Sequence, residues 1–167
     1  MDRLCDLLRF CKDFTLQVAI TESDDLPLRE VAVLTKVLVI DDDKEMTELL
    51  KVILEPNTFD VIAANSGQEG IVLIQEQNPD VVVLDLLMPD MDGWQVCKEI
   101  RSFSQIPILV LSAISKPGMV ARALDEGADD FLLKPMPGGV LTAHIKKLAR
   151  RARAEQGSSK SRLGYYA

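Results

Sequence analysis

The sequence predicts an α/β fold with three layers, in which a doubly wound, five-stranded parallel sheet is covered by helices on both faces. Two observations support this prediction. Short runs of apolar, often β-branched residues recur along the chain, and each is followed by a segment whose apolar residues repeat every three to four positions. The connections between these segments are short, as they are where helices cross over between parallel strands.

The strands are predicted from continuous apolar runs. Residues 81–84 (VVVL) are the clearest case, because consecutive apolar residues that are mostly β-branched are typical of a strand buried on both faces. Turn-forming residues follow this run, which places its end at the edge of the sheet. The predicted strands, in order, are residues 37–40, 59–64, 81–84, 106–111 and 131–133.

The helices are predicted from caps, terminators and apolar spacing. Asp43 can cap the first helix, and Pro56 closes it. Ser66 opens the second helix, which ends near Asn78, and Gly127 ends the fourth. The residues expected on these helices are Met46, Leu49, Leu50 and Ile53; Ile71, Leu73 and Ile74; Trp94, Val96, Cys97 and Ile100; Val120, Ala121 and Leu124; and, after Pro137, Leu141, His144, Ile145 and Leu148.

The two ends of the chain are predicted to lie outside this domain, which spans residues 36–154. Residues 1–35 form an extension of unknown role. Its apolar residues fit either a helix, by their spacing from Leu4 to Phe14, or a half-buried strand, by their alternation from Phe14 to Ile20, and a helix that runs into a strand fits both patterns. Residues 155–167 are rich in glycine and serine and show no periodicity, so a disordered tail is predicted there.

Composition narrows the class of protein. The 167 residues are 47% hydrophobic, enough for a real core, and carry a net charge of −7. Residues 146–162 nevertheless hold seven basic side chains and one acid, which is typical either of a nucleic-acid or partner surface or of a solvated helix whose cations favour its C-terminal dipole. Three cysteines without a C-x-x-C pair, and no apolar run long enough to span a bilayer, predict a soluble cytoplasmic protein that does not associate with membranes.

Polar side chains follow four of the five predicted strands. Asp41 and Asp42 follow the first, Asp85 the third, Ser112 the fourth and Lys134 the fifth, while no comparable cluster follows the second. The carboxyl ends of parallel strands share one edge, where open α/β sheets bind their ligands. A divalent cation held by oxygens, a carboxylate nucleophile, a hydroxyl and an ammonium suit phosphoryl transfer. Each residue alone has an ordinary structural explanation, but the agreement of four strand ends favours a site.

At these positions the sequence resembles the receiver domain of two-component response regulators. The resemblance covers Lys36 to about Ala154 and is carried by IDDD at 40–43, LDLLMPDMDG at 84–93, LSA at 111–113 and KP at 134–135. It implies the flavodoxin-like strand order 2-1-3-4-5, which is taken from the family. It also implies a signalling phosphoacceptor that assists its own phosphorylation and dephosphorylation, and not an enzyme in the usual sense.

The resemblance assigns roles to the residues at the sheet edge. Asp85 is the expected phosphoacceptor, which takes a phosphoryl group from a histidine kinase or a phosphotransfer protein. Asp42, Asp85 and the backbone carbonyl of Leu87 are expected to bind Mg²⁺ directly, and Asp41 to act through water. Lys134 is expected to balance the charge that phosphorylation adds.

The resemblance also implies a conformational switch. Ser112 is expected to move towards the phosphoryl oxygens while Phe131 changes rotamer, which remodels the surface of the fourth helix, fifth strand and fifth helix, a possible homodimer interface. Serine stands where threonine is commoner in the family, and Phe131 lacks a phenolic hydroxyl.

The Lys134–Pro135 bond is expected to be cis. Apolar Leu87 and Ile114 flank the acceptor in the family's geometry and predict a long-lived phosphorylated state, because they cannot orient an attacking water.

Two alternatives remain at this stage. Aspartyl-phosphate hydrolases also use an acidic nucleophile, Mg²⁺ and a lysine, but their nucleophile belongs to a D-x-D motif after the first strand. A scaffold or nucleic-acid binder could use the basic last helix, although a nucleic-acid partner is not favoured. Few residues follow that helix, so no attached output domain is expected in this chain.

Overall fold

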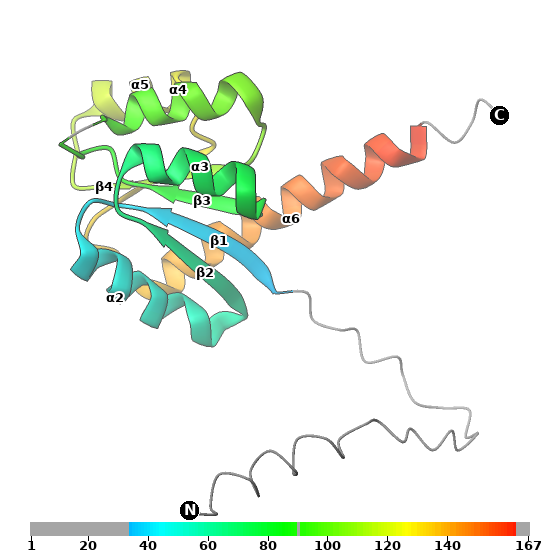
Figure 1. The fold of residues 1–167 in the computed structure, drawn as a ribbon, viewed down its shortest axis with the longest axis horizontal. Helices are drawn as coiled ribbons and strands as arrows, with labels where there is room; N and C mark the ends of the chain where they lie inside the picture. The colour runs from blue at the N-terminus through cyan, green and yellow to red at the C-terminus, as the bar shows by residue number, and fades with distance from the viewer. Residues whose placement is uncertain (1–33, 90, 163–167) are drawn as a thin grey trace, which may run out of the picture. The chain divides into compact units, whose positions relative to one another are not determined.

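The computed structural model describes residues 34–89 and 91–162, with side chains described as far as residue 155. Within these ranges the strands form a single parallel sheet in the order β2-β1-β3-β4-β5 (Figure 1). The predicted α/β class and strand order are therefore confirmed. The strands are β1 (Thr35–Ile40), β2 (Phe59–Ala64), β3 (Val81–Leu84), β4 (Ile108–Ser112) and β5 (Asp130–Leu133).

Each strand is followed by a helix, and the predicted caps are in place. Asp43 accepts hydrogen bonds from the N–H groups of Glu45 and Met46, and Ser66 accepts one from the N–H of Glu69. The helices are α2 (Lys44–Leu54), α3 (Gly67–Gln77), α4 (Gly93–Phe103), α5 (Pro117–Asp125) and α6 (Gly138–Arg162), with a short 3₁₀ turn, η1 (Glu55–Asn57), after α2.

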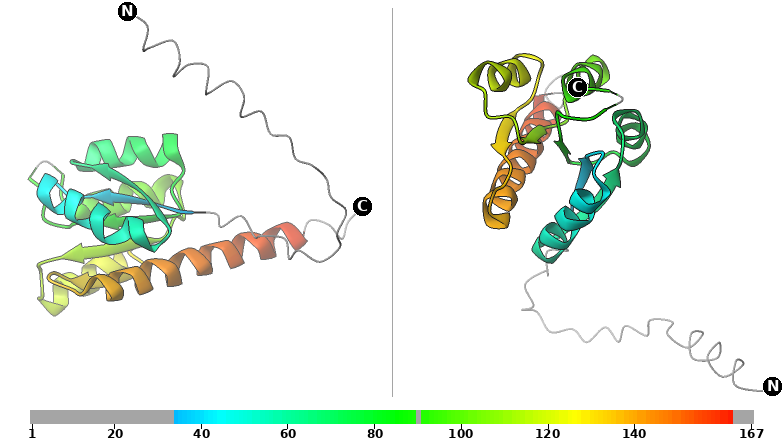
Figure 2. Two further views of the ribbon diagram at one scale, coloured as in Figure 1. Left: turned by 90° about the horizontal axis from the view of Figure 1, so that it is seen from below. Right: turned by 90° about the vertical axis from the view of Figure 1, so that its left-hand side faces the viewer.

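Two hydrophobic cores cover the two faces of the sheet. Leu38 and Ile40 of β1 belong to the core beneath α3, α4 and α5, while Val37 and Val39 belong to the core beneath α2 and α6. The alternation follows from the two-residue period of a strand. The right-hand view of Figure 2 shows α2 (cyan) and α6 (orange) on one side of the sheet and α3, α4 and α5 on the other. This double burial explains why the strands appear in the sequence as continuous apolar runs.

Two predicted details are wrong. Strand β4 begins at Ile108 and not at residue 106, because Pro107 has no N–H to donate to the ladder. Helix α6 continues to Arg162, whereas a disordered tail was predicted from residue 155; alanine, glutamate and glutamine after Arg151 favour helix and let it propagate. His144 on the same helix is half-buried, at the boundary of the core, and contacts the Asp130 carboxylate.

The predicted extension at residues 1–35 falls almost wholly outside the described residues, as does the end of the predicted tail at 163–167. None of the described helices is both long enough and apolar enough to cross a membrane.

Candidate functional site

Three carboxylates converge at the C-terminal edge of the sheet. Strands β1 and β3 are paired neighbours, with Ile40 opposite Leu84, so the residues that follow them are brought together. The N–H of Asp85 donates to the carbonyl of Ile40 at 2.9 Å and fixes this register beyond the strands. One carboxylate oxygen from each of Asp41, Asp42 and Asp85 lies within 4.8 Å of the others, with Asp41 and Asp85 buried and Asp42 exposed.

Lys134 brings a single ammonium to this cluster from the end of β5. Its Nζ lies 2.6 Å from Asp41 Oδ2 and 3.4 Å from Asp85 Oδ2. Its N–H donates to the carbonyl of Ser112 at 2.9 Å, and the following bond to Pro135 is cis, as expected. Among the described residues, one ammonium faces three carboxylates, so this edge carries an excess of negative charge that a divalent cation can balance.

Ser112 and Phe131 lie on the last two strands of the sheet, and Ser112 stands at the strand end next to Lys134. Ser112 is fully buried at the end of β4, and its Oγ accepts a long hydrogen bond of 3.5 Å from the N–H of Ile114. Phe131 is opposite Val110 on β5 and half-buried, packed against the core under α3, α4 and α5. The predicted hydroxyl and the predicted aromatic residue therefore lie on adjacent strands.

The loop between Asp85 and α4 is held close to the site by Gly93. A Cβ on this residue would lie 2.4 Å from the carbonyl oxygen of Asp85 and 2.6 Å from the Cα of Leu86, so only glycine permits this approach. The N–H of Leu86 donates to Asp85 Oδ1 at 2.8 Å, and Leu87, next along, exposes 53% of its surface. Ile114, across the site, is half-buried against the core.

The donor set fits a hard divalent cation. The three carboxylates offer oxygen ligands only, and their mutual separation lies within the reach of a single ion, given Mg–O distances of about 2.0–2.1 Å and small side-chain adjustments. Water must complete such a site, because Mg²⁺ requires six ligands.

A residue that the sequence analysis missed lies at the end of β2. Asn65 is the first residue after this strand, and its Nδ2 donates to the carbonyl of Asp41 at 3.1 Å and to Thr47 Oγ1 at 3.3 Å. The second strand is not followed by a cluster, but it does deliver this one polar group to the edge, and no role was assigned to that group from the sequence. Its position directly after a strand was the available signal, but asparagine before a serine cap is also ordinary turn chemistry.

Comparison with known proteins gives a consistent result. Residues 37–146 match the family of the response regulator receiver domain. The transcriptional regulatory protein AfsQ1 of Streptomyces coelicolor is 40% identical over 74% of this chain and 55% of its own length. The probable transcriptional regulator ycf27 of Porphyridium aerugineum is 38% identical over 77% of this chain and 52% of its own length.

Solved structures agree with these sequence relatives. A two-component response regulator from Clostridium difficile superposes with a TM-score of 0.67 and 35% identity, over 70% of this chain and 97% of that one. A Francisella response regulator receiver domain gives a TM-score of 0.67 and 36% identity, over 70% and 98% of the two chains. The chain spans about half the length of the curated relatives that it matches.

Proposed function

The chain belongs to the response regulator receiver family, and we propose that Asp85 is the carboxylate that accepts the phosphoryl group. Receivers are phosphoacceptors of two-component signalling, a class that implies a kinase partner, and they bind Mg²⁺ at an acidic pocket. The observation that supports Asp85 is its position: it is buried at the end of β3, 3.4 Å from the Lys134 ammonium, and shares its cluster with two further carboxylates.

The reaction is a displacement at phosphorus. An oxygen of the Asp85 carboxylate attacks, a new O–P bond forms, and the bond from phosphorus to the donor's leaving group breaks as that group departs with the electron pair. The donor is a phosphohistidine of a histidine kinase or of a phosphotransfer protein. Lys134 neutralises part of the charge that the phosphoryl group adds.

Asp42, Asp85 and the backbone carbonyl of Leu87 would hold Mg²⁺, with Asp41 acting through water. When bound, the ion screens the repulsion between the carboxylates and the incoming anionic phosphoryl group. Asp41 has a second task, because its Oδ2 lies 2.6 Å from Lys134 Nζ and so orients the ammonium towards the acceptor.

Ser112 would couple phosphorylation to the surface of α5, β5 and α6. Among the residues that the structure describes, its hydroxyl oxygen accepts only a long bond of 3.5 Å from the N–H of Ile114, so turning towards a phosphoryl oxygen costs little. That movement would free space at the end of β4, towards which the ring of Phe131, two positions back on the adjacent strand β5, would turn. This α5–β5–α6 surface carries exposed apolar side chains at Leu124 and Leu133.

We expect the α5–β5–α6 surface to form a homodimer or partner interface that phosphorylation strengthens. Adding beryllofluoride and Mg²⁺ should lower the dissociation constant of the dimer by about 5- to 150-fold. This factor corresponds to the coupling free energy of about 1–3 kcal/mol that is typical between two sites. Analytical ultracentrifugation with and without beryllofluoride measures this change. If wild type and Leu124→Asp sediment identically, both with and without beryllofluoride, the α5–β5–α6 surface is not the interface.

Leu87 and Ile114 should make the phosphorylated state long-lived. Hydrolysis needs a water aligned opposite the Asp85 oxygen, and two apolar side chains cannot orient one. Leu87→Asn and Ile114→Glu, singly and together, should speed the loss of phosphate, followed by intact mass. If the double variant loses phosphate no faster than wild type, these residues do not control the lifetime.

Reduction of the acyl phosphate tests the proposed acceptor directly. After reaction with acetyl phosphate and Mg²⁺, borohydride should convert the phosphorylated aspartate to homoserine, and peptide mapping should find homoserine at residue 85. Homoserine at another aspartate, or the corresponding longer alcohol at a glutamate, would overturn the assignment.

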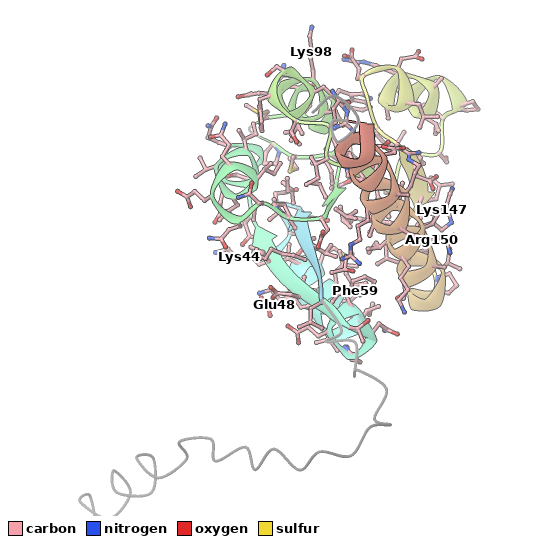
Figure 3. All side chains as sticks on the ribbon, turned by 90° about the vertical axis from the view of Figure 1, so that its right-hand side faces the viewer. Lys44, Glu48, Phe59, Lys98, Lys147 and Arg150 are labelled. Atoms are coloured by element: carbon pink, nitrogen blue, oxygen red, sulfur yellow. The ribbon has the colours of Figure 1, made fainter. Side chains whose placement is uncertain are left out.

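The basic last helix gives no support to a nucleic-acid function. Lys147 contacts Asp130, Arg151 contacts Asp129, and Arg153 lies 3.5 Å from Asp80, so these cations are already paired within the domain. Figure 3 shows Lys147 and Arg150 on the outward side of α6. Part of the charge asymmetry in the sequence thus stabilises the fold.

A further inference from the structure

We infer that Asn65 is a positioning residue for the magnesium site: its side-chain amide sets the plane of the Asp41–Asp42 peptide and thereby the direction in which Asp42 presents its carboxylate. The inference rests on the proposed function, which assigns Asp42 to the metal. Asn65 follows β2, the strand whose C-terminal end was not expected to contribute to the site.

The end of β2 holds the backbone of Asp41 on both sides. The N–H of Asp41 donates to the carbonyl of Ala64 at 3.1 Å, and the carbonyl of Asp41 accepts from Asn65 Nδ2 at 3.1 Å. Ala64 therefore binds the peptide group before Asp41, and Asn65 binds the peptide group after it.

The orientation of the Asn65 amide follows from its partners. The carbonyl of Asp41 can only accept, so the NH₂ group must face it. Its other partner, Thr47 Oγ1, lies 3.3 Å away and already donates its proton to the carbonyl of Lys44 at 3.0 Å. Thr47 is almost completely buried, so this arrangement is sheltered from water.

The consequence falls on Asp42. Because the peptide bond is planar, fixing the Asp41 carbonyl also fixes the N–H and Cα of Asp42, from which its side chain starts. In the part of the chain that the structure describes, no hydrogen bond or ion pair holds the Asp42 carboxylate. Its direction therefore depends on the backbone, unlike that of Asp41, which Lys134 holds.

Asn65 is itself firmly anchored. Its N–H donates to Glu69 Oε2 at 2.7 Å, and the N–H of Glu69 donates to Ser66 Oγ at 3.2 Å. This reciprocal pair resembles a capping box at the start of α3 and fixes the backbone from which the amide projects. The first turn of α3 is thus linked through Asn65 to the loop that carries the metal ligands.

A magnesium titration of Asn65→Ala tests the inference. Its Kd for Mg²⁺, followed by isothermal titration calorimetry and by the fluorescence of Trp94, should rise about fivefold, the equilibrium factor of one lost neutral hydrogen bond. The matched control is Asn57→Ala, because Asn57 Nδ2 also donates to a backbone carbonyl, that of Ile53 at 2.9 Å, away from the site. Asn57→Ala should lose stability but keep the wild-type Kd.

Kinetics separate positioning from a structural effect. Phosphorylation by acetyl phosphate should be slower in Asn65→Ala at low Mg²⁺ and should return to the wild-type rate at saturating Mg²⁺. Thr47→Val, which removes the second acceptor and leaves Asn65 in place, should raise the Kd in the same direction by a smaller factor, and it decides the question if Asn65→Ala does not fold.

Two negative results have different meanings. If wild type and Asn57→Ala bind Mg²⁺ and the Asn65→Ala and Thr47→Val variants bind it equally well, the role of Asn65 is overturned while the proposed site stands. If wild type itself binds no Mg²⁺, the proposed site fails and the inference with it.

Discussion

Strand β3 has an aspartate at each end, and the two lie in opposite surroundings. Asp80 precedes the strand, and its carboxylate accepts the N–H of Lys36 at 2.8 Å and lies 3.5 Å from the guanidinium of Arg153. Asp85 follows the strand and shares a single ammonium with two other carboxylates. An aspartate at the N-terminal edge of the sheet thus has a cationic partner, whereas at the C-terminal edge the carboxylates outnumber the ammonium that they share.

The next aspartate at the N-terminal edge, Asp129, shows the same pairing more strongly. Its Oδ2 accepts from Arg101 Nη2 at 2.7 Å and from the N–H of Ile108 at 2.9 Å, while its Oδ1 contacts Arg151. Arg101 also donates to the carbonyls of Gly127 and Ile106. This network joins α4, the strand edge and α6, and it needs no ligand to complete it.

The comparison teaches that charge balance, more than residue type, distinguishes the edge at which we propose the site from the edge whose aspartates are paired. Where each carboxylate has a cationic partner, the attraction between them stabilises the fold. Where three carboxylates face one ammonium, the carboxylates repel one another, and this repulsion is relieved when a cation binds.

The largest expected effect is a difference in stability between the two edges. In Mg²⁺-free buffer, Asp129→Asn should lower the free energy of unfolding by about 2–3 kcal/mol, because it leaves Arg101 without its charged partner in a partly buried site. Asp85→Asn should leave it unchanged or raise it, because one of several like charges is removed. Urea denaturation measures both.

The control for this pair is Asp125→Asn, an exposed acid at the end of α5, which should change stability by less than about 0.5 kcal/mol. A loss in Asp85→Asn as large as that in Asp129→Asn would mean that the two edges do not differ in charge balance.

A smaller effect comes from magnesium. At about ten times its Kd, Mg²⁺ should raise the free energy of unfolding of the wild type by about 1.4 kcal/mol through mass action. In Asp129→Asn, Mg²⁺ should raise the free energy of unfolding by the same amount, although that variant is less stable than wild type. In Asp42→Asn, most of this rise should be lost. Thermal unfolding with and without Mg²⁺ measures the increments; equal increments in wild type and Asp42→Asn contradict the site.

The smallest expected effect is the pH dependence of Asp130, also at the N-terminal edge. Burial alone would raise the pKa of its carboxyl, but hydrogen bonds from His144, the N–H of Phe131 and Lys147 together hold that pKa below its usual range. The ionised carboxylate therefore stabilises the fold above the unfolded-state pKa of about 4, and this stabilisation is lost as the pH falls through the lower folded-state pKa.

Asp130→Asn should accordingly cost less than about 1 kcal/mol at pH 7, the range of part-exposed ion pairs, and the cost should vanish in acid. Comparing urea midpoints of wild type and variant at pH 7 and at about pH 3 measures the change. A cost that is the same at both pH values would show that the carboxylate charge is not the cause.

The fold and most of the site were predictable because their signals are local. The position of Asp85 at the sheet edge could be predicted from the apolar run before it and the turn formers after it, and the pairing of β1 with β3 brings it beside Asp41. The contacts of Asn65 and Asp129 could not be found in this way. Asn65 meets Asp41 from 24 positions away and Asp129 meets Arg101 from 28, and each residue alone is typical of a turn.

The helix that continues past residue 154 was missed for a different reason. Glycine and serine after Gln156 have low helix propensity, but propensity is a weak guide where a helix is already formed and need only propagate.

Phosphorylation of the two aspartates that flank β3 tests the central claim most directly. Wild type, Asp85→Asn and Asp80→Asn should be incubated with acetyl phosphate and Mg²⁺ and compared by intact mass. We predict one added phosphoryl group on wild type and on Asp80→Asn, and none on Asp85→Asn. An undiminished yield on Asp85→Asn, or a loss confined to Asp80→Asn, would contradict the assignment of function to the edge with excess charge.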